Sequence, residues 1–554
     1  MTTDTPATAK SVTKVVVVSG AVLATSAYLY YLWSTRPLPN EGASCCVDED
    51  GDGDGDGESC ECGSESCTTT TTGMPELEDL DLSAEVTPAA STTMRSRKAE
   101  VMRKTVERGS VVGSGDGNLP GAGQKIFFKT FGCSHNTSDS EYMMGLLSRY
   151  GYDFVGKIAD ADVVVLNSCT VKNPSEDALA TLVKAAEAEG LPTVVCGCVP
   201  QADRKSRALR NASLVGTSQI DRIVEVVEET LRGNRVSLLQ SKKLPELREL
   251  PKIRRNPLVE IVAVNTGCLG KCSYCKTKYA RGSLGSYSKE DIIARVRTAL
   301  AEGVQQIWLT SEDLGAYGLD IGTNVAELLR EIVGELEKYP DSMMRLGMTN
   351  PPYILQHAEE VAKILTHPQV FEFIHIPIQS GSNDVLRHMI REYTVEDFDR
   401  LVGILRARVP NLTVATDVIC GFPTESEENH RETLELIKRH RFPVINISQF
   451  YARPGTAAAR IRPRLPGKVI KERSTEVTNL FMSYSLTDSL YDIGEVVEVW
   501  YDEVDEGRGQ TVGHTKRYTK AVLLGIHKGV LGKKMRARVE DNSSKWHVVV
   551  SLVE

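Results

Sequence analysis

Most of this sequence, from residue 125 onward, has almost no net charge. Among its 554 residues, 65 are Lys or Arg and 74 are Asp or Glu, which gives a formal net charge of −9. Residues 1 to 124 contain 9 of the basic and 19 of the acidic residues, so residues 125 to 554 contain 56 and 55 and carry +1. The acidity therefore belongs to the N-terminal segment. Any nucleic-acid contact of the remainder must come from a local basic patch and not from its total charge.

Residues 37 to 123 lack the apolar side chains that a core needs. Asp, Gly, Ser and Thr dominate them, so burial cannot offset the entropy lost on ordering, and we expect a disordered acidic tether. An alternating Asp-Gly repeat matches the spacing of a calcium-binding EF-hand loop, but no amphipathic helix flanks it and Gly57 takes a position that is usually apolar. We therefore predict no calcium site there. The matching residues are Asp50, Asp52, Asp54, Gly55 and Glu61.

A chain of this length does not need disulfide bonds to hold its fold. Five of the 13 cysteines lie between Cys45 and Cys67, and eight lie between Cys133 and Cys420. Cysteines scattered through an α/β pattern are more often metal ligands or core residues than disulfide partners. The sequence therefore favours a reducing compartment.

One segment, from Val15 to Trp33, lacks charge altogether. As a helix its 19 residues would span about 28 Å, enough for the hydrocarbon core of a bilayer. Aromatic residues gather at its far end, as in an interfacial belt. A cleavable signal peptide is the alternative, because Thr25 and Ala27 have cleavage-like spacing, but the apolar run is longer than an ordinary signal core. We predict a membrane anchor over residues 1–36.

The chain after residue 123 is predicted to form three α/β or β domains. Residues 124–235 alternate β-branched runs with helical patterns, which indicates a Rossmann-like parallel sheet buried on both faces. A basic, Pro-containing linker over 236–257 precedes six strand–helix units over 258–485, typical of a partial (β/α)6 barrel. Residues 486–554, with β-branched segments and Gly turns, predict a small β-barrel. The strands expected in the first two domains are 125–131, 163–167, 193–197, 259–265, 305–310, 345–348, 373–378, 413–419 and 444–450.

The strongest chemical signal is the C-x3-C-x2-C motif of Cys268, Cys272 and Cys275 after the first barrel strand. Three thiolates on one tight loop can hold three irons of a [4Fe–4S] cluster and leave the fourth iron open. A zinc site would need a fourth Cys or His, and none lies nearby in the sequence. The motif resembles that of the radical S-adenosylmethionine (SAM) superfamily, in which the open iron binds SAM and an electron cleaves it to a 5′-deoxyadenosyl radical. This resemblance makes the three cysteines the catalytic cluster ligands and places Tyr274 next to the adenine of SAM.

A second set of cysteines follows the strands of the first domain. Cys133, Cys169 and Cys198 each lie just past the end of a predicted parallel strand. Because the carboxyl ends of parallel strands share one edge of the sheet, the three thiols should converge as a second open-iron site. Three buried structural cysteines are the alternative. Cys196 is still inside its apolar run, and we predict that it is a small core residue.

These cysteine motifs carry a closer resemblance, which covers the chain from about residue 125 to its end. FGCSHN, NSCTVKNPSED and GCVPQ, followed by the C-x3-C-x2-C loop, are similar to the methylthiotransferase family. TVKNPSED, MTNPPYIL, HIPIQSGSNDVL and QFYARPGT are similar in particular to the archaeal and eukaryotic branch that acts on N6-threonylcarbamoyladenosine. The resemblance implies two [4Fe–4S] clusters, SAM, and methylthiolation at C2 of that nucleoside next to the anticodon of transfer RNA (tRNA). It also implies that the N-terminal cluster carries the sulfur.

Two other functions stay open at this point. A methylthiotransferase for isopentenyladenosine or for a ribosomal protein would use the same cysteines. A membrane-tethered RNA-binding scaffold without catalysis would not need them, and the complete set of six argues against it.

Polar residues just past the barrel strands are the candidate SAM contacts, because ligands bind at that end of such barrels. In addition to Tyr274, they are Ser311, Glu312, Asp313, Asn350, Gln379, Ser380 and Gly421. The C-terminal domain contains a basic stretch, from Gly507 to Val539, with nine Lys or Arg and no Asp or Glu. It resembles the RNA-binding TRAM domain, and we expect Lys516, Arg517 and Lys520 to contact tRNA phosphates. Arg281 and Lys278 are expected to meet phosphates near the target base.

Location and partners follow from this chemistry. Reduced clusters and tRNA are not expected in an oxidising lumen, so we predict an endoplasmic reticulum anchor with the catalytic body in the cytosol, or alternatively the outer mitochondrial membrane. The flanking charges oppose this topology, because Lys10 and Lys14 precede the apolar segment while Arg36 follows it. A monomer that receives electrons from an unidentified donor is expected.

Overall fold

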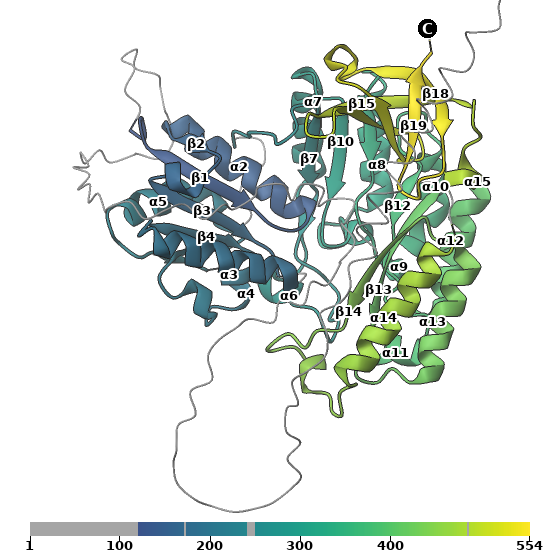
Figure 1. Ribbon diagram of the computed structural model, residues 1–554, viewed down its shortest axis with the longest axis horizontal. Coiled ribbons are helices and arrows are strands. Elements are labelled where there is room, and N and C mark those ends of the chain that lie inside the picture. Colours follow the sequence, from purple (N-terminus) through teal and green to yellow (C-terminus); the bar gives the residue numbers. More distant parts are fainter. Residues whose placement is uncertain (1–119, 171–172, 241–249, 485–486, 554) are drawn as a thin grey trace, which may run out of the picture. The chain divides into compact units, whose positions relative to one another are not determined.

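The computed structural model describes residues 120–170, 173–240, 250–484 and 487–553. The predicted anchor and tether lie outside these residues. Within the described ranges, no helix is both long enough and apolar enough to cross a membrane. The described residues fold as a parallel-sheet domain, a partial barrel and a closed β-barrel (Figure 1).

The first domain is a six-stranded parallel sheet with helices on both faces (Figure 1). Val163 and Val165 of β3 pack in one hydrophobic cluster with α2 and α5, whereas Val164 and Leu166 pack in the other with α3. This alternation explains the continuous apolar runs, because a strand covered on both sides must be apolar at every position. The strands, in spatial order, are β2 (Asp153–Val155), β1 (Lys125–Thr130), β3 (Val163–Ser168), β4 (Thr193–Gly197), β5 (Ser213–Val215) and β6 (Ser237–Leu238). The helices are α2 (Ser134–Tyr150), α3 (Asn173–Ala188), α4 (Cys198–Ala202) and α5 (Ile223–Leu231).

The second domain is an open barrel of six parallel strands. Strands β11, β10 and β7 form one sheet and β12, β13 and β14 another, and parallel bridges from Met344 to Val370 and from Met348 to His375 join them. The barrel is thus an arc, as the six strand–helix units predicted. The strands are β7 (Val259–Ala263), β10 (Gln306–Thr310), β11 (Met343–Arg345), β12 (Phe373–His375), β13 (Thr413–Cys420) and β14 (Val444–Gln449).

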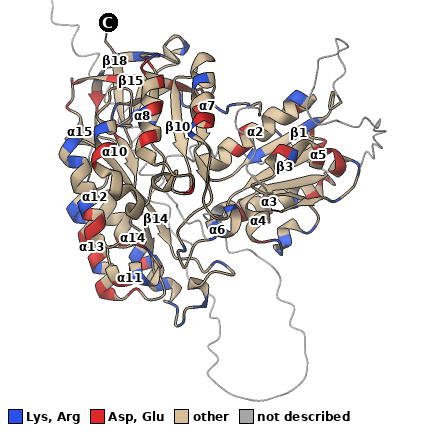
Figure 2. Ribbon diagram, turned by 180° about the vertical axis from the view of Figure 1, so that it is seen from behind, with Lys and Arg blue, Asp and Glu red and all other residues tan. Residues whose placement is uncertain are grey.

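The barrel helices begin at polar caps and bury one apolar face. Ser288, Asn324, Thr394 and Ser426 each accept a backbone N–H at the start of a helix. Charged residues of both signs lie along the outer helices α12 and α13, whereas the strands β10 and β14 are mostly uncharged (Figure 2). The outer helices are α7 (Lys289–Ala301), α8 (Val325–Leu336), α10 (Ala358–Leu365), α12 (Val395–Arg408), α13 (Glu427–His440) and α14 (Gly467–Met482).

The third domain is a closed barrel in the order β15-β16-β17-β19-β18. It packs against the partial barrel: the Trp500 indole donates to Asp341 O at 3.1 Å, and the Gln306 amide donates to Asp502 Oδ2 at 2.8 Å. Tyr518, at a φ of 59°, places its ring against Phe371 and Phe373. The strands are β15 (Val496–Asp505), β16 (Gln510–Thr515), β17 (Lys520–Leu524), β18 (Lys534–Asp541) and β19 (His547–Leu552).

Several of the observed strands differ from the predicted ones. β11 ends at Arg345, where the strand was expected to begin, because the next residues leave the ladder and form only the single bridge at Met348. β6 lies inside the predicted linker and extends the first sheet through its pairing with β5. The short strands β2 and β5 were not predicted, since three residues carry no readable period.

Candidate active site

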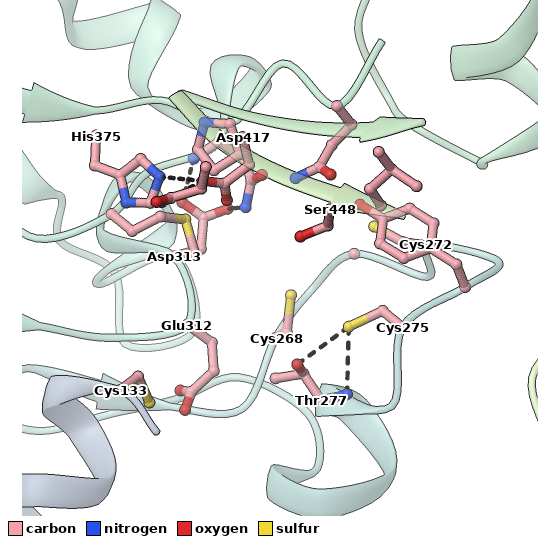
Figure 3. Close-up of a pocket in the computed structure, with 18 of the residues that line it drawn as sticks. Cys133, Cys268, Cys272, Cys275, Thr277, Glu312, Asp313, His375, Asp417 and Ser448 are labelled. Carbon is pink, nitrogen blue, oxygen red and sulfur yellow. Dashed lines mark hydrogen bonds and ion pairs between the residues drawn. The ribbon is translucent and has the colours of Figure 1, made fainter. Parts of the chain in front are cut away.

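The six predicted ligand cysteines line one cavity of about 320 Å³ at the carboxyl ends of the strands. In Figure 3, Cys133 and Glu312 lie at the lower left, His375 and Asp417 lie at the upper left, and Cys268 and Cys275 lie to their right. The remaining ligand cysteines that line it are Cys169, Cys198, Cys272 and Cys275. The cavity therefore joins the edge of the first sheet to the interior of the partial barrel.

The loop with Cys268, Cys272 and Cys275 is fixed by short backbone contacts. Cys268 N donates to Gly282 O at 3.2 Å, and the Lys278 amine donates to Leu269 O at 3.0 Å. Lys278 thus closes this loop, which differs from its predicted role at a phosphate. Burial raises the pKa of Cys268 to about 12, and burial also raises that of Cys275 although Thr277 hydrogen bonds oppose the shift. Neutral thiols are therefore favoured unless a metal stabilises the thiolates.

Arg391 lies next to this loop, and the sequence did not identify it as a site residue. Its guanidinium donates to the Cys272 sulfur at 3.1 Å and to Asn350 Oδ1, and it stacks over Tyr393. Asn350 in turn donates to Asp313 at 2.9 Å. Burial raises the pKa of Asp313 to about 6. This half-buried cation thus connects a cluster-ligand candidate to two predicted SAM contacts.

The second set of thiols converges as predicted from the sheet topology. Cys133 precedes α2, Cys169 follows β3, and Cys198 opens α4. Gly132 has a φ of 88°, and a Cβ there would lie 2.4 Å from the Cys169 sulfur, so only glycine lets these segments approach. Cys196 is fully buried in the hydrophobic cluster of α2 and α5, as expected of a core residue.

A buried cation, Arg281, lies beside this second set and favours the thiolate form of its cysteines. A hydrogen bond from Cys169 and the charge of Arg281 lower the pKa of Cys133, against the effect of burial. Burial raises the pKa of Cys198 to about 12 although Arg281 opposes it. The Arg281 guanidinium also donates to Asn136 Oδ1 at 3.0 Å. Arg281 is only 8% exposed, so the prediction that it meets RNA phosphates is wrong.

Glu312 occupies a different place from the SAM contact that was predicted. Its carboxylate oxygen Oε1 lies 3.0 Å from Arg281 Nε and 3.0 Å from His135 Nδ1, both beside the second set of thiols. Those two cations lower the pKa of Glu312 against its burial. Although it follows a barrel strand, Glu312 therefore serves the junction with the first domain.

The other predicted SAM contacts divide into two groups. Tyr274, Ser311, Asp313, Asn350 and Gln379 line the cavity. Two others are engaged in the barrel wall and lie outside it. Ser380 lies against Thr433, and Gly421 N donates to Glu425 while its open side is filled by Ile470. The predictions for Ser380 and Gly421 are therefore wrong.

A polar layer deeper in the barrel was also not predicted. His375, Asp417 and Asn446 come from the adjacent strands β12, β13 and β14 and line the cavity. His375 Nε2 lies 2.8 Å from Asp417 Oδ1, and the Asn446 amide donates to the same oxygen at 2.9 Å. The signal was available in the sequence, since each is a polar residue inside an otherwise buried strand.

No group of three or more His, Cys, Asp or Glu side chains in the described part of the chain is arranged to hold a single metal ion. Three thiolates at an open cluster bind three different irons, so they need not meet at one point. The two cysteine sets therefore fit clusters better than mononuclear metal sites.

The predicted RNA contacts are only partly on a free surface. The Lys516 amine donates to the carbonyl oxygens of His367 and Val370 in the partial barrel, and burial lowers its pKa to about 8. Arg517 donates to Leu490 O and stacks over Tyr491. Lys516 thus holds the third domain against the partial barrel, and Arg517 is engaged within the third domain, so we withdraw both as phosphate contacts. Lys520, half-buried on β17, stays a prediction.

The solvent face of β18 offers cations that the sequence did not single out. Lys534, Arg536 and Arg538 are exposed and alternate with less exposed residues, so all three point to one face of the strand. They form the β18 stripe. Lys534 lies 3.1 Å from Glu498, which leaves the other two as its stronger cationic part.

Comparison with known proteins divides the chain in the same way. The pattern of an uncharacterized protein family, UPF0004, matches residues 125–216, and that of the radical SAM superfamily matches residues 262–437. A threonylcarbamoyladenosine tRNA methylthiotransferase of Drosophila pseudoobscura pseudoobscura is 47% identical over 498 residues, which cover 86% of this chain and 88% of that one. The Homo sapiens protein of the same name is 48% identical over 438 residues, 78% of this chain and 74% of that one. A probable threonylcarbamoyladenosine tRNA methylthiotransferase of Pyrococcus abyssi (strain GE5 / Orsay) is 38% identical over 424 residues, 76% of this chain and 98% of that one.

Proposed function

This chain belongs to the family of threonylcarbamoyladenosine tRNA methylthiotransferases, and we propose that it places a methylthio group on C2 of N6-threonylcarbamoyladenosine next to the anticodon of tRNA. The enzyme is a transferase that uses SAM and two [4Fe–4S] clusters. One observation supports the proposal most directly: two separate sets of three cysteines line a single cavity. A binding scaffold would have no use for that arrangement.

The residues present fit two clusters. Each set is a trio of thiols beside an arginine, the half-buried Arg391 for the first set and the buried Arg281 for the second. Gly270 leaves the space between the Cys268 and Cys272 sulfurs open, because a Cβ there would lie 3.6 and 3.8 Å from them. When bound, the first cluster supplies the electron and the open iron for SAM, and the second supplies the sulfur. We assign Cys268, Cys272 and Cys275 to the first cluster and Cys133, Cys169 and Cys198 to the second.

The protein's own part is to position SAM and to exclude water. Asp313, held by Asn350 and Gly315 N, presents a carboxylate at the cavity, and Arg391 presents a cation beside it. These opposite charges suit the amino and carboxylate groups of SAM. Tyr274 packs against the apolar cluster of Val385 and Phe422 and closes the side of the cavity beside the cysteine loop. Ser311 and Gln379 are the remaining SAM contacts that we propose.

The tRNA contact is assigned to the third domain. The β18 stripe presents a regular row of exposed cations, and Lys520 adds one on β17. Phosphate contacts of this kind give affinity without sequence information, so the choice of nucleoside falls to the cavity. The chain is proposed to act as a monomer that receives electrons from a separate donor.

Residues 15–33 are proposed to anchor the chain in the endoplasmic reticulum, with the catalytic body in the cytosol. The uncharged length of this segment supports the anchor, and the need for tRNA and a reducing environment supports the topology. Protease treatment of intact microsomes tests it. Digestion of the body is expected, and protection of the body would overturn the topology. Release of the intact chain by alkaline carbonate would overturn the anchor, and recovery in the outer mitochondrial membrane would overturn the choice of membrane.

The activity is tested by nucleoside analysis. Cells that lack 2-methylthio-N6-threonylcarbamoyladenosine should gain it when they express this chain, and the Cys268→Ala variant should not restore it. Mass spectrometry of digested tRNA measures both. Methylthiolation of isopentenyladenosine in its place, or no methylthiolated nucleoside from protein that holds both clusters, would contradict the proposed function.

A further inference from the structure

The inner end of the cavity contains charged groups that neither cluster explains. His375, Asp417 and Asn446 form one hydrogen-bonded layer across three strands. Beneath it, Arg345 lines the same cavity and is 4% exposed. The guanidinium carbon of Arg345 lies 5.0, 5.0 and 4.9 Å from the ring centroids of Trp308, Phe373 and Tyr518. Aromatic side chains thus hold this cation at the bottom of a site that opens toward the clusters.

The layer lies at a depth that suits a substituent of the target base. Asp417 is two residues before Ile419 on β13, and both line the cavity. With a rise of roughly 3.3 Å per residue, Asp417 lies roughly 7 Å deeper than Ile419. In adenine, C2 and C6 are separated by N1 in the same ring, so a group on N6 extends several ångströms beyond the reacting carbon. If C2 faces the clusters at the mouth, the N6 group reaches inward.

The chemistry of the layer matches a threonyl group. A threonylcarbamoyl substituent carries a carboxylate, a hydroxyl group and urea N–H groups. The guanidinium of Arg345 and the ring of His375 can donate to a carboxylate, and Asp417 can accept from a hydroxyl or an N–H group. We infer that Arg345, His375 and Asp417 form the subsite for the threonine part of the substrate, a conclusion that rests on the proposed function.

Such a subsite would also reject other nucleosides. An isopentenyl group offers no hydrogen bonds, so its binding would place an apolar group against the buried Arg345 and the half-buried His375 and Asp417 and would supply none of the hydrogen bonds that the threonine offers. Sites that hydrogen-bond a substrate discriminate strongly against analogues that lack those groups. The polar layer therefore accounts for the choice between two tRNA substrates that the cysteine motifs alone leave open.

The test changes the substrate first, with the wild-type protein loaded with both clusters. Two anticodon stem-loop RNAs are compared, one with N6-threonylcarbamoyladenosine and one with its threonine methyl ester, which lacks the negative charge. We expect the ester to lower kcat/KM by about tenfold to a hundredfold, as the loss of a charge-assisted hydrogen bond would. Equal kcat/KM for acid and ester would overturn the subsite. Loss of activity on both RNAs, with methylthiolation of an isopentenyladenosine stem-loop, would instead overturn the proposed function.

A protein variant with a matched control then locates the effect. His375→Gln should lower kcat/KM for the acid about tenfold and reduce the difference between acid and ester. His440→Gln breaks another His–Asp pair, in which His440 Nε2 lies 2.6 Å from Asp399 Oδ1 on the outer helices, and it should leave that difference unchanged. Reductive SAM cleavage without RNA should be unaffected in His440→Gln, and it is measured in His375→Gln as well. If His375→Gln lowers that cleavage, or lowers acid and ester equally, the layer serves SAM or the fold and the inference fails.

Discussion

Arg281 Nη2, at the end of the short helix α6 (Thr277–Arg281) that follows the cysteine loop, lies 2.7 Å from Asp139 Oδ2 of α2 in the first domain. Both side chains are buried, and Glu312 holds the same guanidinium from the barrel side. One cation therefore connects the two halves of the cavity and lies beside the second set of thiols. Its removal would leave two carboxylates buried at the domain junction.

We expect Arg281→Met to destabilise the protein by about 3–5 kcal/mol, because breaking a buried ion pair leaves charge without compensation. Arg281→Lys should lower the free energy of unfolding by less, since it keeps the positive charge but loses the planar guanidinium group that contacts several oxygens at once. Denaturant unfolding measures the free energy. An exposed arginine with a single helical neighbour, such as Arg387, serves as the control and should change stability by about 1 kcal/mol or less. Equal losses at Arg281 and Arg387 would contradict the junction role.

Cys198→Ala should lower bound iron from about eight to about four atoms per chain, because one of two four-iron clusters loses a ligand. Reductive cleavage of SAM should continue at the other set, and methylthiolated product should disappear. Cys196→Ala is the matched control: the side chain is fully buried in the core, so it should keep both clusters at a modest stability cost. Iron analysis of anaerobically purified protein decides, and an exchange of these two phenotypes would show that the ligands are wrongly assigned.

Reversal of Lys534, Arg536 and Arg538 to Glu should weaken tRNA binding and lower the salt dependence of its affinity, with the log–log slope reduced by about 2, because phosphate neutralisation releases counterions. Reversal of Arg431 and Lys438 on the exterior of α13 is the control and should leave both quantities unchanged. Lys516→Glu should act differently. It places a carboxylate against two carbonyl oxygens, so we expect a lower unfolding temperature before any selective loss of RNA affinity. A β18 stripe variant with wild-type affinity would remove this strand from the RNA surface.

Glu260 should make the protein sensitive to acid. Its side chain is fully buried against Lys252 and Arg295, and despite the opposing effect of burial these cations lower its pKa to about 2. A carboxyl group whose pKa is lower in the folded state stabilises the protein above its unfolded pKa, and the contribution disappears as the pH falls toward the folded value. The stability difference between wild type and Glu260→Gln should therefore be largest near pH 7 and shrink from about pH 4.5 to about pH 2. Unfolding of the metal-free protein at each pH measures it, and a constant difference would contradict the shift.

The positions of the cysteines could be predicted because they follow from one-dimensional features. Cys133, Cys169 and Cys198 each come after a strongly apolar strand, and parallel topology alone brings such residues to one edge. The same rule placed Asp313 and Asn350 at the cavity. The rule failed for Ser380 and Gly421. A residue's position after a strand does not reveal whether it forms hydrogen bonds within the barrel wall instead of facing the cavity.

Contacts between domains were beyond reach of the sequence. From the sequence alone, Lys516 and Arg281 look like surface cations, and only the packing of separate domains reveals that each contacts specific oxygens of another domain. The inward layer of His375 and Asp417 had a readable signal, a charged residue in an apolar strand, but its partner lies 42 positions away.

Tyr518 connects the third domain to the inner end of the catalytic cavity. Its ring packs against Phe373 and against the guanidinium of Arg345, two residues that line the inner end of the catalytic cavity. A chain that ends before residue 486 would lack this ring, so water would be expected to enter the cavity at its inner end. We expect such a truncated enzyme to cleave SAM without methylthiolating tRNA. Excess tRNA would not restore the coupling between the two reactions. The third domain would for this reason be needed for the reaction itself, whatever it contributes to RNA binding.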